Sequence, residues 1–181
     1  GVSDCLIEKN VFYNNFFGIY LQKTDRITIT SNTIHSFAKT ETNSGNGIHL
    51  WYCMNTTIRG NTISGHRDGI YLEFSKHNLM TGNAAKRNLR YGLHFMFSDS
   101  SRYTGNKFFE NGAGVAVMYS SYIDMEENLF LNNKGPASYG LLLKDINRSI
   151  ISGNRFTGNT KGIFMEASGK CSINRNLFEN N

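Results

Sequence analysis

The sequence predicts an all-β chain built from one short unit that repeats along its whole length. The unit is Gly, an apolar residue, any residue and a second apolar residue, and it occurs seven times in 181 residues. In every copy an Asn follows the Gly by fourteen positions, as Asn106 follows Gly92. Eighteen Gly, one Pro and alternating β-branched or aromatic residues favour short strands and tight turns. One copy cannot bury its apolar face but stacked copies can, so we expect a right-handed parallel β-helix.

Each coil of this helix is expected to take about 22 residues, which gives seven to eight coils. The distance from each corner Asn to the next Gly varies between 8 and 15 residues. All variation in length therefore leaves from one corner, through the loops Ala38 to Asn46 and Asn133 to Tyr139. Variable loops on a regular scaffold are where binding usually resides. The repeat glycines are Gly18, Gly47, Gly69, Gly92, Gly114, Gly140 and Gly162, and the matching asparagines are Asn32, Asn61, Asn83, Asn106, Asn128, Asn154 and Asn176.

Three ladders of apolar side chains are expected to point inward, and the Asn side chains to bond from coil to coil as scaffold. Equivalent residues of neighbouring coils lie about 4.8 Å apart in such a stack. The first ladder is Ile19, Ile48, Ile70, Leu93, Val115, Leu141 and Ile163; the second is Leu21, Leu50, Leu72, Phe95, Val117, Leu143 and Met165; the third is Phe12, Ile34, Ile63, Ala85, Phe108, Phe130, Phe156 and Phe178.

Residues 1–181 are predicted to form a single parallel β-helix domain, an uncapped fragment of a longer chain, because both ends fall inside a repeat. The longest apolar runs are far shorter than the roughly 20 residues of a membrane helix, so no membrane span is predicted. The formal charge of +5 and the pI near 9.1 are scattered along the chain without a nucleic-acid-binding motif. We therefore expect no nucleic-acid partner.

The residues two and four positions after each repeat Gly are predicted to point outward and to form an apolar surface. Met96 and Met118 stack in adjacent coils of this surface, beside His94. Thioethers and imidazole are ligands that suit copper(I), so these residues are a candidate metal site. His49 belongs to the same row but lies two coils from His94, roughly 10 Å away. The other interpretation, that the Met and aromatic side chains pack under a loop or a partner, stays open, and no tightly bound cofactor is expected beyond transient copper.

Exposed apolar patches are typical of contact sites, and a basic edge runs beside this one. The basic edge consists of Arg67, Lys86, Arg87, Arg90, Lys134 and Lys161. Such charges either keep a surface soluble or steer an acidic partner or an anionic group toward it. The residues predicted to bind a partner are Trp51, Tyr71, Glu73, Arg87, Arg90 and Tyr119.

A carbohydrate-active β-helix enzyme is the alternative class. Its chemistry needs two or three carboxylates that converge about 5 to 10 Å apart on one sugar. Glu73 and Glu166 share a ladder but lie four coils apart, and Asp25 and Asp99 lie three coils apart. No catalytic residue is therefore predicted, and a lyase, hydrolase or epimerase is disfavoured.

Five segments of the chain depart from a generic repeat and carry a resemblance to a known family. The most specific is Arg-Tyr-Gly-Leu-His-Phe-Met-Phe-Ser-Asp at residues 90–99, and the others lie at 69–75, 86–90, 112–119 and 139–145. These segments resemble the NosD family of maturation proteins for nitrous oxide reductase. The resemblance implies a non-enzymatic periplasmic assembly factor for the copper-sulfide cluster of that reductase. It implies as partners nitrous oxide reductase itself, the permease and ATPase subunits of an ABC transporter, and a copper chaperone.

Overall fold

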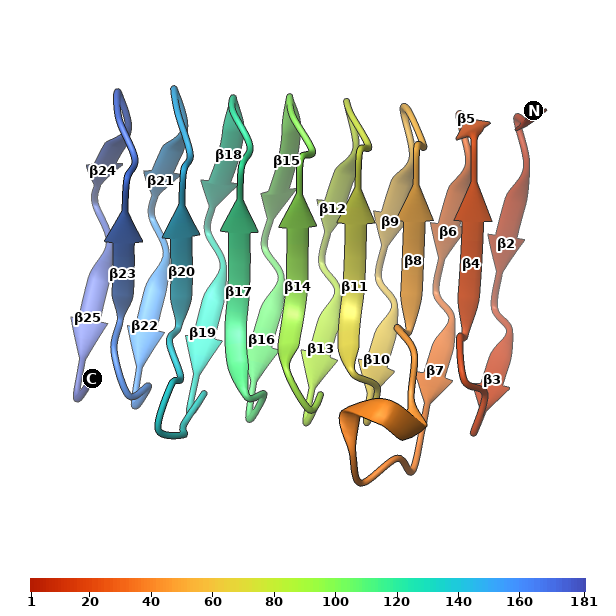
Figure 1. The fold of residues 1–181 in the computed structure, drawn as a ribbon, viewed down its shortest axis with the longest axis horizontal. Coiled ribbons are helices and arrows are strands. Elements are labelled where there is room, and N and C mark those ends of the chain that lie inside the picture. The colour runs from red at the N-terminus through yellow and green to blue at the C-terminus, as the bar shows by residue number, and fades with distance from the viewer.

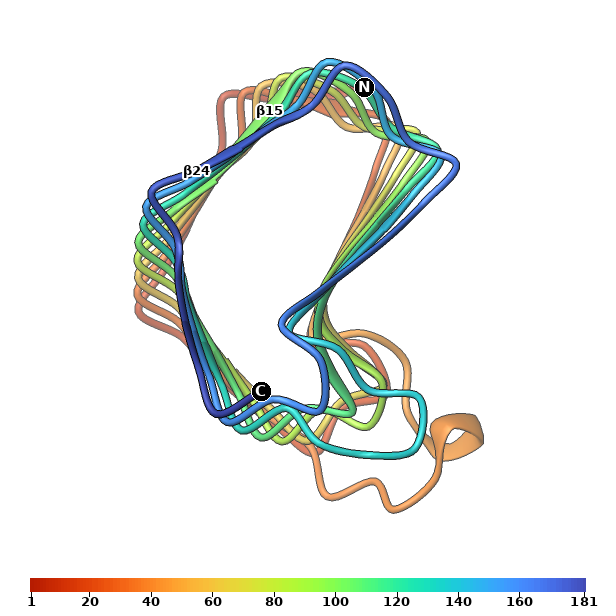
Figure 2. The same ribbon diagram turned by 90° about the vertical axis from the view of Figure 1, so that its left-hand side faces the viewer.

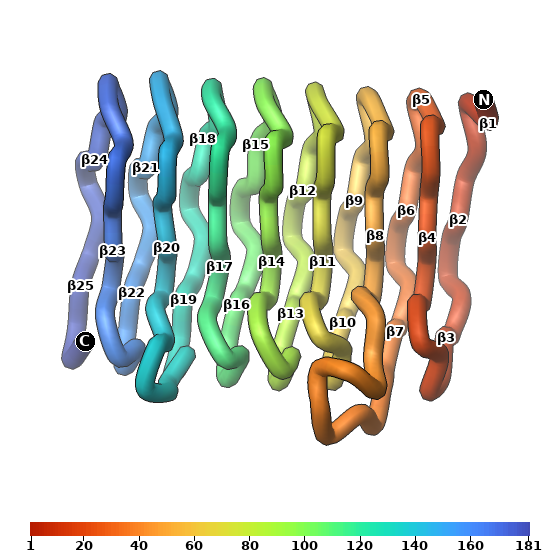
Figure 3. Tube along the Cα trace, viewed as in Figure 1, coloured from red at the N-terminus to blue at the C-terminus, as the bar shows by residue number.

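The computed structural model describes residues 1–181 and confirms a right-handed parallel β-helix with almost no helical structure. Successive coils lie side by side along one axis, and the two termini lie at opposite ends of the stack (Figures 1 and 3). Every pairing between strands is parallel, with each strand bonded to its equivalent in the next coil. The three faces of the stack are three long sheets. The chain contains no helix with the length and apolar character needed to span a membrane.

The front sheet of Figure 1 carries the repeated Gly-apolar-any-apolar unit and is the sheet that positions the candidate site. Its strands in chain order are β4 (Ile19–Gln22), β8 (Ile48–Trp51), β11 (Asp68–Glu73), β14 (Tyr91–Met96), β17 (Ala113–Met118), β20 (Leu141–Lys144) and β23 (Ile163–Glu166).

Two further sheets of eight strands each complete the coils. The second sheet holds β2 (Leu6–Glu8), β6 (Thr28–Thr30), β9 (Thr57–Arg59), β12 (Leu79–Thr81), β15 (Ser101–Thr104), β18 (Ile123–Glu126), β21 (Ile150–Ser152) and β24 (Ser172–Asn174). The third holds β3 (Val11–Tyr13), β7 (Thr33–His35), β10 (Thr62–Ser64), β13 (Ala84–Lys86), β16 (Lys107–Phe109), β19 (Leu129–Leu131), β22 (Arg155–Thr157) and β25 (Leu177–Glu179). A short pair, β1 (Val2–Ser3) with β5 (Thr24–Asp25), and the 3-10 helix η1 (Glu41–Asn43) are the remaining elements.

The three predicted apolar ladders lie in the interior, except that Met165 and Phe178 are exposed in the last coil. A fourth buried ladder, which was not predicted, runs along the second sheet and consists of Ile29, Ile58, Met80, Tyr103, Met125 and Ile151. Ile70 pairs with Leu93 and Leu72 pairs with Phe95, and all four are buried. In the third ladder the rings of Phe130 and Phe156 stack at 4.4 Å between centroids. Full burial of such side chains contributes about 1.5 to 3 kcal/mol each, which offsets the entropy of ordering the turns.

The asparagine ladder is also confirmed as scaffold. The backbone N–H of Asn83 and its side-chain Nδ2 both donate to Oδ1 of Asn106, each at 2.9 Å. Asn106 repeats the same pair of bonds to Asn128 in the next coil. Because these asparagines are buried, each amide must be satisfied by its neighbours, which explains why the residue recurs without exception.

The repeat glycines mark an inward bend at the lower end of the front sheet. Viewed down the stack, each coil turns inward there before it reaches the loops (Figure 2). A Cβ on Gly92 would lie 2.7 Å from the carbonyl oxygen of Gly114, and one on Gly69 would lie 2.5 Å from that of Gly92. No side chain fits between adjacent coils at this vertex. Glycine is required there because a Cβ would collide with the backbone of the next coil. The two predicted loops, the longer with η1, leave just below the bend (Figures 1 and 2).

Candidate functional site

The bend brings two rows of outward residues against each other, and we call this surface the bend face. It consists of the residue immediately before each repeat Gly and the residue two positions after it. Tyr91 and His94 are such a pair, with ring centroids 4.9 Å apart, and Nδ2 of Asn46 lies 3.3 Å from Nδ1 of His49. The full set is Phe17 with Tyr20, Asn46 with His49, Asp68 with Tyr71, Tyr91 with His94, Ala113 with Ala116, Tyr139 with Leu142, and Lys161 with Phe164.

The expectation of an exposed outward row is wrong for the two histidines. His49 and His94 are only 8% and 4% exposed, although both point away from the core. His49 lies between the rings of Tyr20 and Tyr71, at 4.7 Å from each, and Tyr71 in turn lies 4.8 Å from His94. The chain covers this row itself, because the bend places the preceding residues over it.

A buried carboxylate, which the ladder mapping did not consider, organises the centre of the bend face. Asp68 is fully buried and accepts hydrogen bonds from Nε of Arg90 at 2.9 Å and from Nη2 at 2.6 Å. Its Oδ2 also lies 3.4 Å from Nδ1 of His94. Burial alone would raise the pKa of Asp68, but the hydrogen bonds from Arg90 and His94 lower it below its usual value. Asp68 is therefore ionised at neutral pH and can only accept hydrogen bonds.

This arrangement fixes the tautomer that His94 adopts when its ring is neutral. Since Asp68 only accepts, Nδ1 of His94 carries the hydrogen and Nε2 keeps its lone pair. Nε2 is buried and has no hydrogen-bond partner. A carboxylate that orients one imidazole nitrogen while the other stays open is the usual support for a metal-binding histidine. His49 also has an unpartnered Nε2, and burial followed by the charge of Arg67 lowers its pKa to about 4, so it is neutral.

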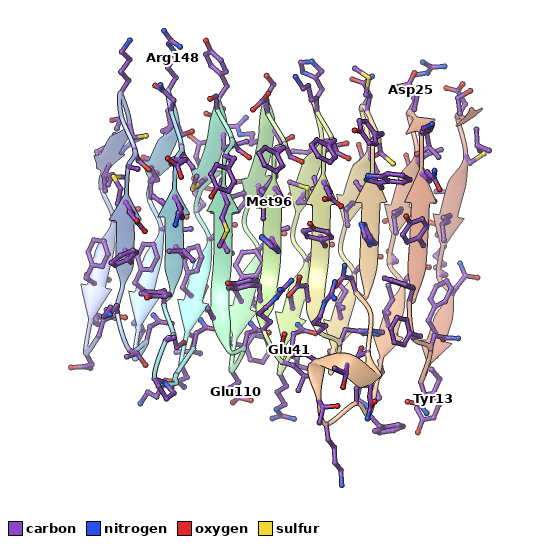
Figure 4. The ribbon with its side chains drawn as sticks, in the orientation of Figure 1. Tyr13, Asp25, Glu41, Met96, Glu110 and Arg148 are labelled. Atoms are coloured by element: carbon purple, nitrogen blue, oxygen red, sulfur yellow. The ribbon has the colours of Figure 1, made fainter.

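Met96 and Met118 are direct cross-strand partners in β14 and β17, as predicted, and both are half-buried. Met96 lies on the outer face of the front sheet in Figure 4. His94 is two residues before Met96 on the same face of β14, about 6.6 Å along the strand. His49 is separated from His94 by Tyr71 of the intervening strand, which keeps it outside this group. No group of three or more His, Cys, Asp or Glu side chains is suited to a metal ion, so a site here needs the thioethers.

Directly after this sheet, four exposed aromatic residues form a continuous stack that we call the aromatic ridge. It consists of Tyr52, Phe74, Phe97 and Tyr119, which occupy the same position in four adjacent coils. Their rings stack nearly parallel, with centroids 4.9, 5.2 and 5.0 Å apart. All four have φ of 50 to 52°, a left-handed conformation that bulky side chains rarely adopt. The ridge borders a groove of about 410 Å³ that Met54, Lys76 and Asp99 also line.

The other predicted partner-binding residues fall into three places. Trp51 packs edge-on against Tyr52 at 5.3 Å, and Glu73 lies between Trp51 and Met96 in the front sheet. Tyr71 belongs to the bend face, where burial followed by the charge of Glu73 raises its pKa to about 12. Arg87 is exposed and pairs with Glu110 at 2.7 Å, and Arg90 is held by Asp68. The predicted basic edge is thus partly neutralised by its own acidic neighbours.

Comparison with solved structures identifies other proteins with this fold. The crystal structure of the periplasmic alginate epimerase AlgG aligns with a TM-score of 0.76 at 17% identity, over 96% of this chain and 43% of that one. The A-module of the mannuronan C-5 epimerase AlgE6 of Azotobacter vinelandii aligns at 0.73 and 13%, over 97% and 58%. PfbA, a surface adhesin of Streptococcus pneumoniae, aligns at 0.71 and 12%, over 98% and 61%. The chain thus spans about half the length of these proteins, and the likeness shows the fold alone.

A search of the curated proteins gives no match. A family model described as periplasmic copper-binding protein (NosD), in contrast, matches residues 35–181, which cover the whole bend face from Asn46 onward and the complete aromatic ridge. The chain belongs to this NosD family of periplasmic copper-binding proteins.

Proposed function

We propose that this protein is a periplasmic assembly factor that binds copper(I) transiently during maturation of nitrous oxide reductase. The observation that carries the proposal is the buried His94, oriented by Asp68, with an open Nε2 on the same strand face as Met96 and its partner Met118. The copper-binding family supports this use of the three residues. Copper is cargo in this account, and no resident cofactor and no catalytic residue are required.

The aromatic ridge gives the proposal a docking surface. Phe97 and Tyr119 directly follow Met96 and Met118 in the chain, so a partner seated on the ridge would also cover the thioethers. The rings face one another and offer their edges to solvent, which suits an apolar protein surface better than a stacked sugar ring. We propose that the copper chaperone docks here, and that nitrous oxide reductase and the transporter permease and ATPase subunits are the further partners of the whole protein.

The test is capture of each of these partners by the full-length protein, with Phe97→Asn as the ridge variant. Asn tolerates the left-handed conformation at this corner, so the variant should fold. We expect wild type to retain the copper-loaded chaperone and the variant to lose it. If wild type captures none of the partners, the assembly function is wrong.

One observation favours a second candidate, a carbohydrate-active enzyme. Asp68, His94, Arg90 and Tyr71 form a set of acid and base groups that the search for carboxylate pairs in the sequence did not find. Burial raises the pKa of Tyr71 to about 12, so its phenol is a hydrogen-bond donor at neutral pH, and Nε2 of His94 has no hydrogen-bond partner within the chain. Turnover of a uronate polymer by the full-length protein, abolished in His94→Ala, would establish this candidate in place of the first.

A further inference from the structure

A small hollow lies beside the bend face, below the front sheet. It lies where the coil that contains β17 has smaller side chains than the coils on either side. Gly112 and Ala113 stand where the preceding coil has Arg90 and Tyr91 and the following coil has Ser138 and Tyr139. The inserted loop of residues 133–139 lies beside the gap and, with Arg90 and Tyr91, lines an open hollow of about 290 Å³. The hollow is therefore produced by small residues in one coil and an insertion in the next.

The inserted loop is held by one internal turn and by contacts of Gly135 with Thr160 of the next coil. The backbone N–H of Ser138 donates to the carbonyl of Gly135 at 3.1 Å, and the N–H of Gly135 donates to Oγ1 of Thr160 at 3.2 Å. Thr160 returns a hydrogen bond from its hydroxyl to the carbonyl of Gly135 at 3.3 Å. These bonds give the wall of the hollow a defined shape.

Three donor groups without a partner in the protein belong to residues that line this hollow. The hydroxyl of Ser138 is buried, at 1% residue exposure, and has no hydrogen-bond partner. Asp68 engages Nε and Nη2 of Arg90, which leaves Nη1 without a partner on the guanidinium that Asp68 holds in place. Lys134 is exposed and takes part in none of the ion pairs of the chain. A buried hydroxyl without a partner costs about 1 to 3 kcal/mol, so a ligand that bonds to it is favoured.

The charge balance of the hollow is positive. No Asp or Glu lines it, whereas Arg90 and Lys134 do. The negative charge of Asp68 balances the positive charge of Arg90, and Glu41 also acts on Arg90 at longer range. Lys134 therefore supplies the excess positive charge. The remaining wall is apolar, with the ring of Tyr91, Ala113 and Pro136. The ring of Tyr91 also lies under the guanidinium of Arg90, at 5.1 Å from Cζ.

We propose that this hollow is a binding site for a small organic oxyanion, such as a phosphate monoester. The anionic oxygens would bond to Lys134, Ser138 and Nη1 of Arg90, three groups that donate and carry no competing acceptor charge into the hollow. The organic part would pack on Tyr91 and Pro136. The site uses none of His94, Met96 and Met118 and does not depend on copper binding, although Asp68 contacts both Arg90 and His94.

The test is calorimetric titration of the metal-free full-length protein with phenyl phosphate and with inorganic phosphate. We expect phenyl phosphate to bind several-fold more tightly, because only its ring uses the apolar wall. Lys134→Gln and Ser138→Ala should each weaken binding by about 5-fold or more, the equivalent of one lost hydrogen bond. Lys107→Gln, an exposed lysine of β16, removes the same charge away from the hollow and should leave the affinity unchanged.

Thermal melting of each variant shows whether it is folded before its titration is compared. The proposal is overturned if neither anion binds, if the two anions bind equally, or if Lys134→Gln and Ser138→Ala bind phenyl phosphate as wild type does. Loss of binding in Lys107→Gln to the same extent would also contradict it, because the effect would then reflect net charge alone.

Discussion

Asp68 joins two adjacent coils of the front sheet through His94. Its Oδ2 lies 3.4 Å from Nδ1 of His94, while both carboxylate oxygens accept hydrogen bonds from the guanidinium of Arg90. The carboxylate belongs to β11, Arg90 directly precedes β14, and His94 lies within β14. One buried anion thereby fixes both the cation and the imidazole that face the outside of the helix.

Replacement of this anion tests its role. Asp68→Asn should destabilise the fold by about 1 to 3 kcal/mol, less than for a fully buried pair because Arg90 is 34% exposed. It should also weaken copper(I) binding about 10- to 100-fold, since the ring of His94 loses the group that orients it. Urea unfolding and copper competition measure the two effects. Asp99→Asn is the control, because it removes the charge that pairs with Lys76 but keeps the Oδ1 that accepts a hydrogen bond from the backbone N–H of Ser121. It should change neither quantity by a comparable amount.

A second ladder of side-chain amides runs through Asn88, Asn111, Asn133, Asn159 and Asn181, and the histidine at its start gives a prediction for pH. His66 stands where neighbouring coils have Asn88 and Asn111, and burial lowers its pKa to about 4 from 6.5. The unfolded chain therefore binds more protons between about pH 6.5 and 4, and stability falls as the pH falls through this window. His66→Asn should continue the ladder to Asn88 and weaken this dependence, with His49 accounting for part of what remains. Melting temperatures at pH 7.5 and pH 4.5 measure the difference; an unchanged slope would contradict the assignment.

The vertex glycines should not tolerate a methyl group. In Gly92→Ala the new Cβ would lie 2.7 Å from the carbonyl of Gly114 and 2.9 Å from the ring of Phe108. Adjacent coils would have to separate, at a cost of about 1 to 3 kcal/mol. Gly105→Asn is the matched control, because Gly105 has φ of +64° and open space around its Cβ position, which Asn tolerates. Equal stability of the two variants in urea unfolding would show that contact does not select glycine at the bend.

The aromatic ridge should matter for binding more than for folding. Phe97 is 44% exposed and has φ of 50°, so Phe97→Asn removes apolar surface and relieves a conformation unfavourable to an aromatic residue. We expect a change in stability within about 1 kcal/mol together with loss of the chaperone in the capture experiment. Phe97→Tyr keeps the stack and should retain the partner. A large loss of stability in Phe97→Asn would instead make the ridge part of the scaffold.

The repeat determined the fold from the sequence because each ladder is a periodic pattern. The constant spacing between Gly and Asn fixed which residues pair, and Met96 and Met118 are partners as expected. The bend face could not be derived in this way. Side chains alternate between the two faces of a strand only while the strand is straight. Because the chain bends at each Gly, Asp68 lies on the outer side, beside His94. The row before each Gly reads Phe, Asn, Asp, Tyr, Ala, Tyr and Lys. This mixture of polar and apolar residues differs from the core ladders, and it was the sign in the sequence that the row does not face the core.

The aromatic ridge was missed for a different reason. Corner positions with positive φ usually hold Gly or Asn, and aromatic side chains there are too rare for composition to reveal. Tyr119 was predicted as a partner residue, but its stacking on Phe97 through four coils depends on the corner geometry. Spacing in sequence gives the register of such residues and not their exposure.

The central claim is that His94, Met96 and Met118 bind copper(I), and a competition titration against a colorimetric copper(I) chelator tests it most directly. Wild type should withdraw copper from the chelator, and the His94→Ala/Met96→Ala/Met118→Ala variant should withdraw at least about 10-fold less at the same concentration. Equal uptake by the two folded proteins would contradict the site and leave these side chains with a packing role only.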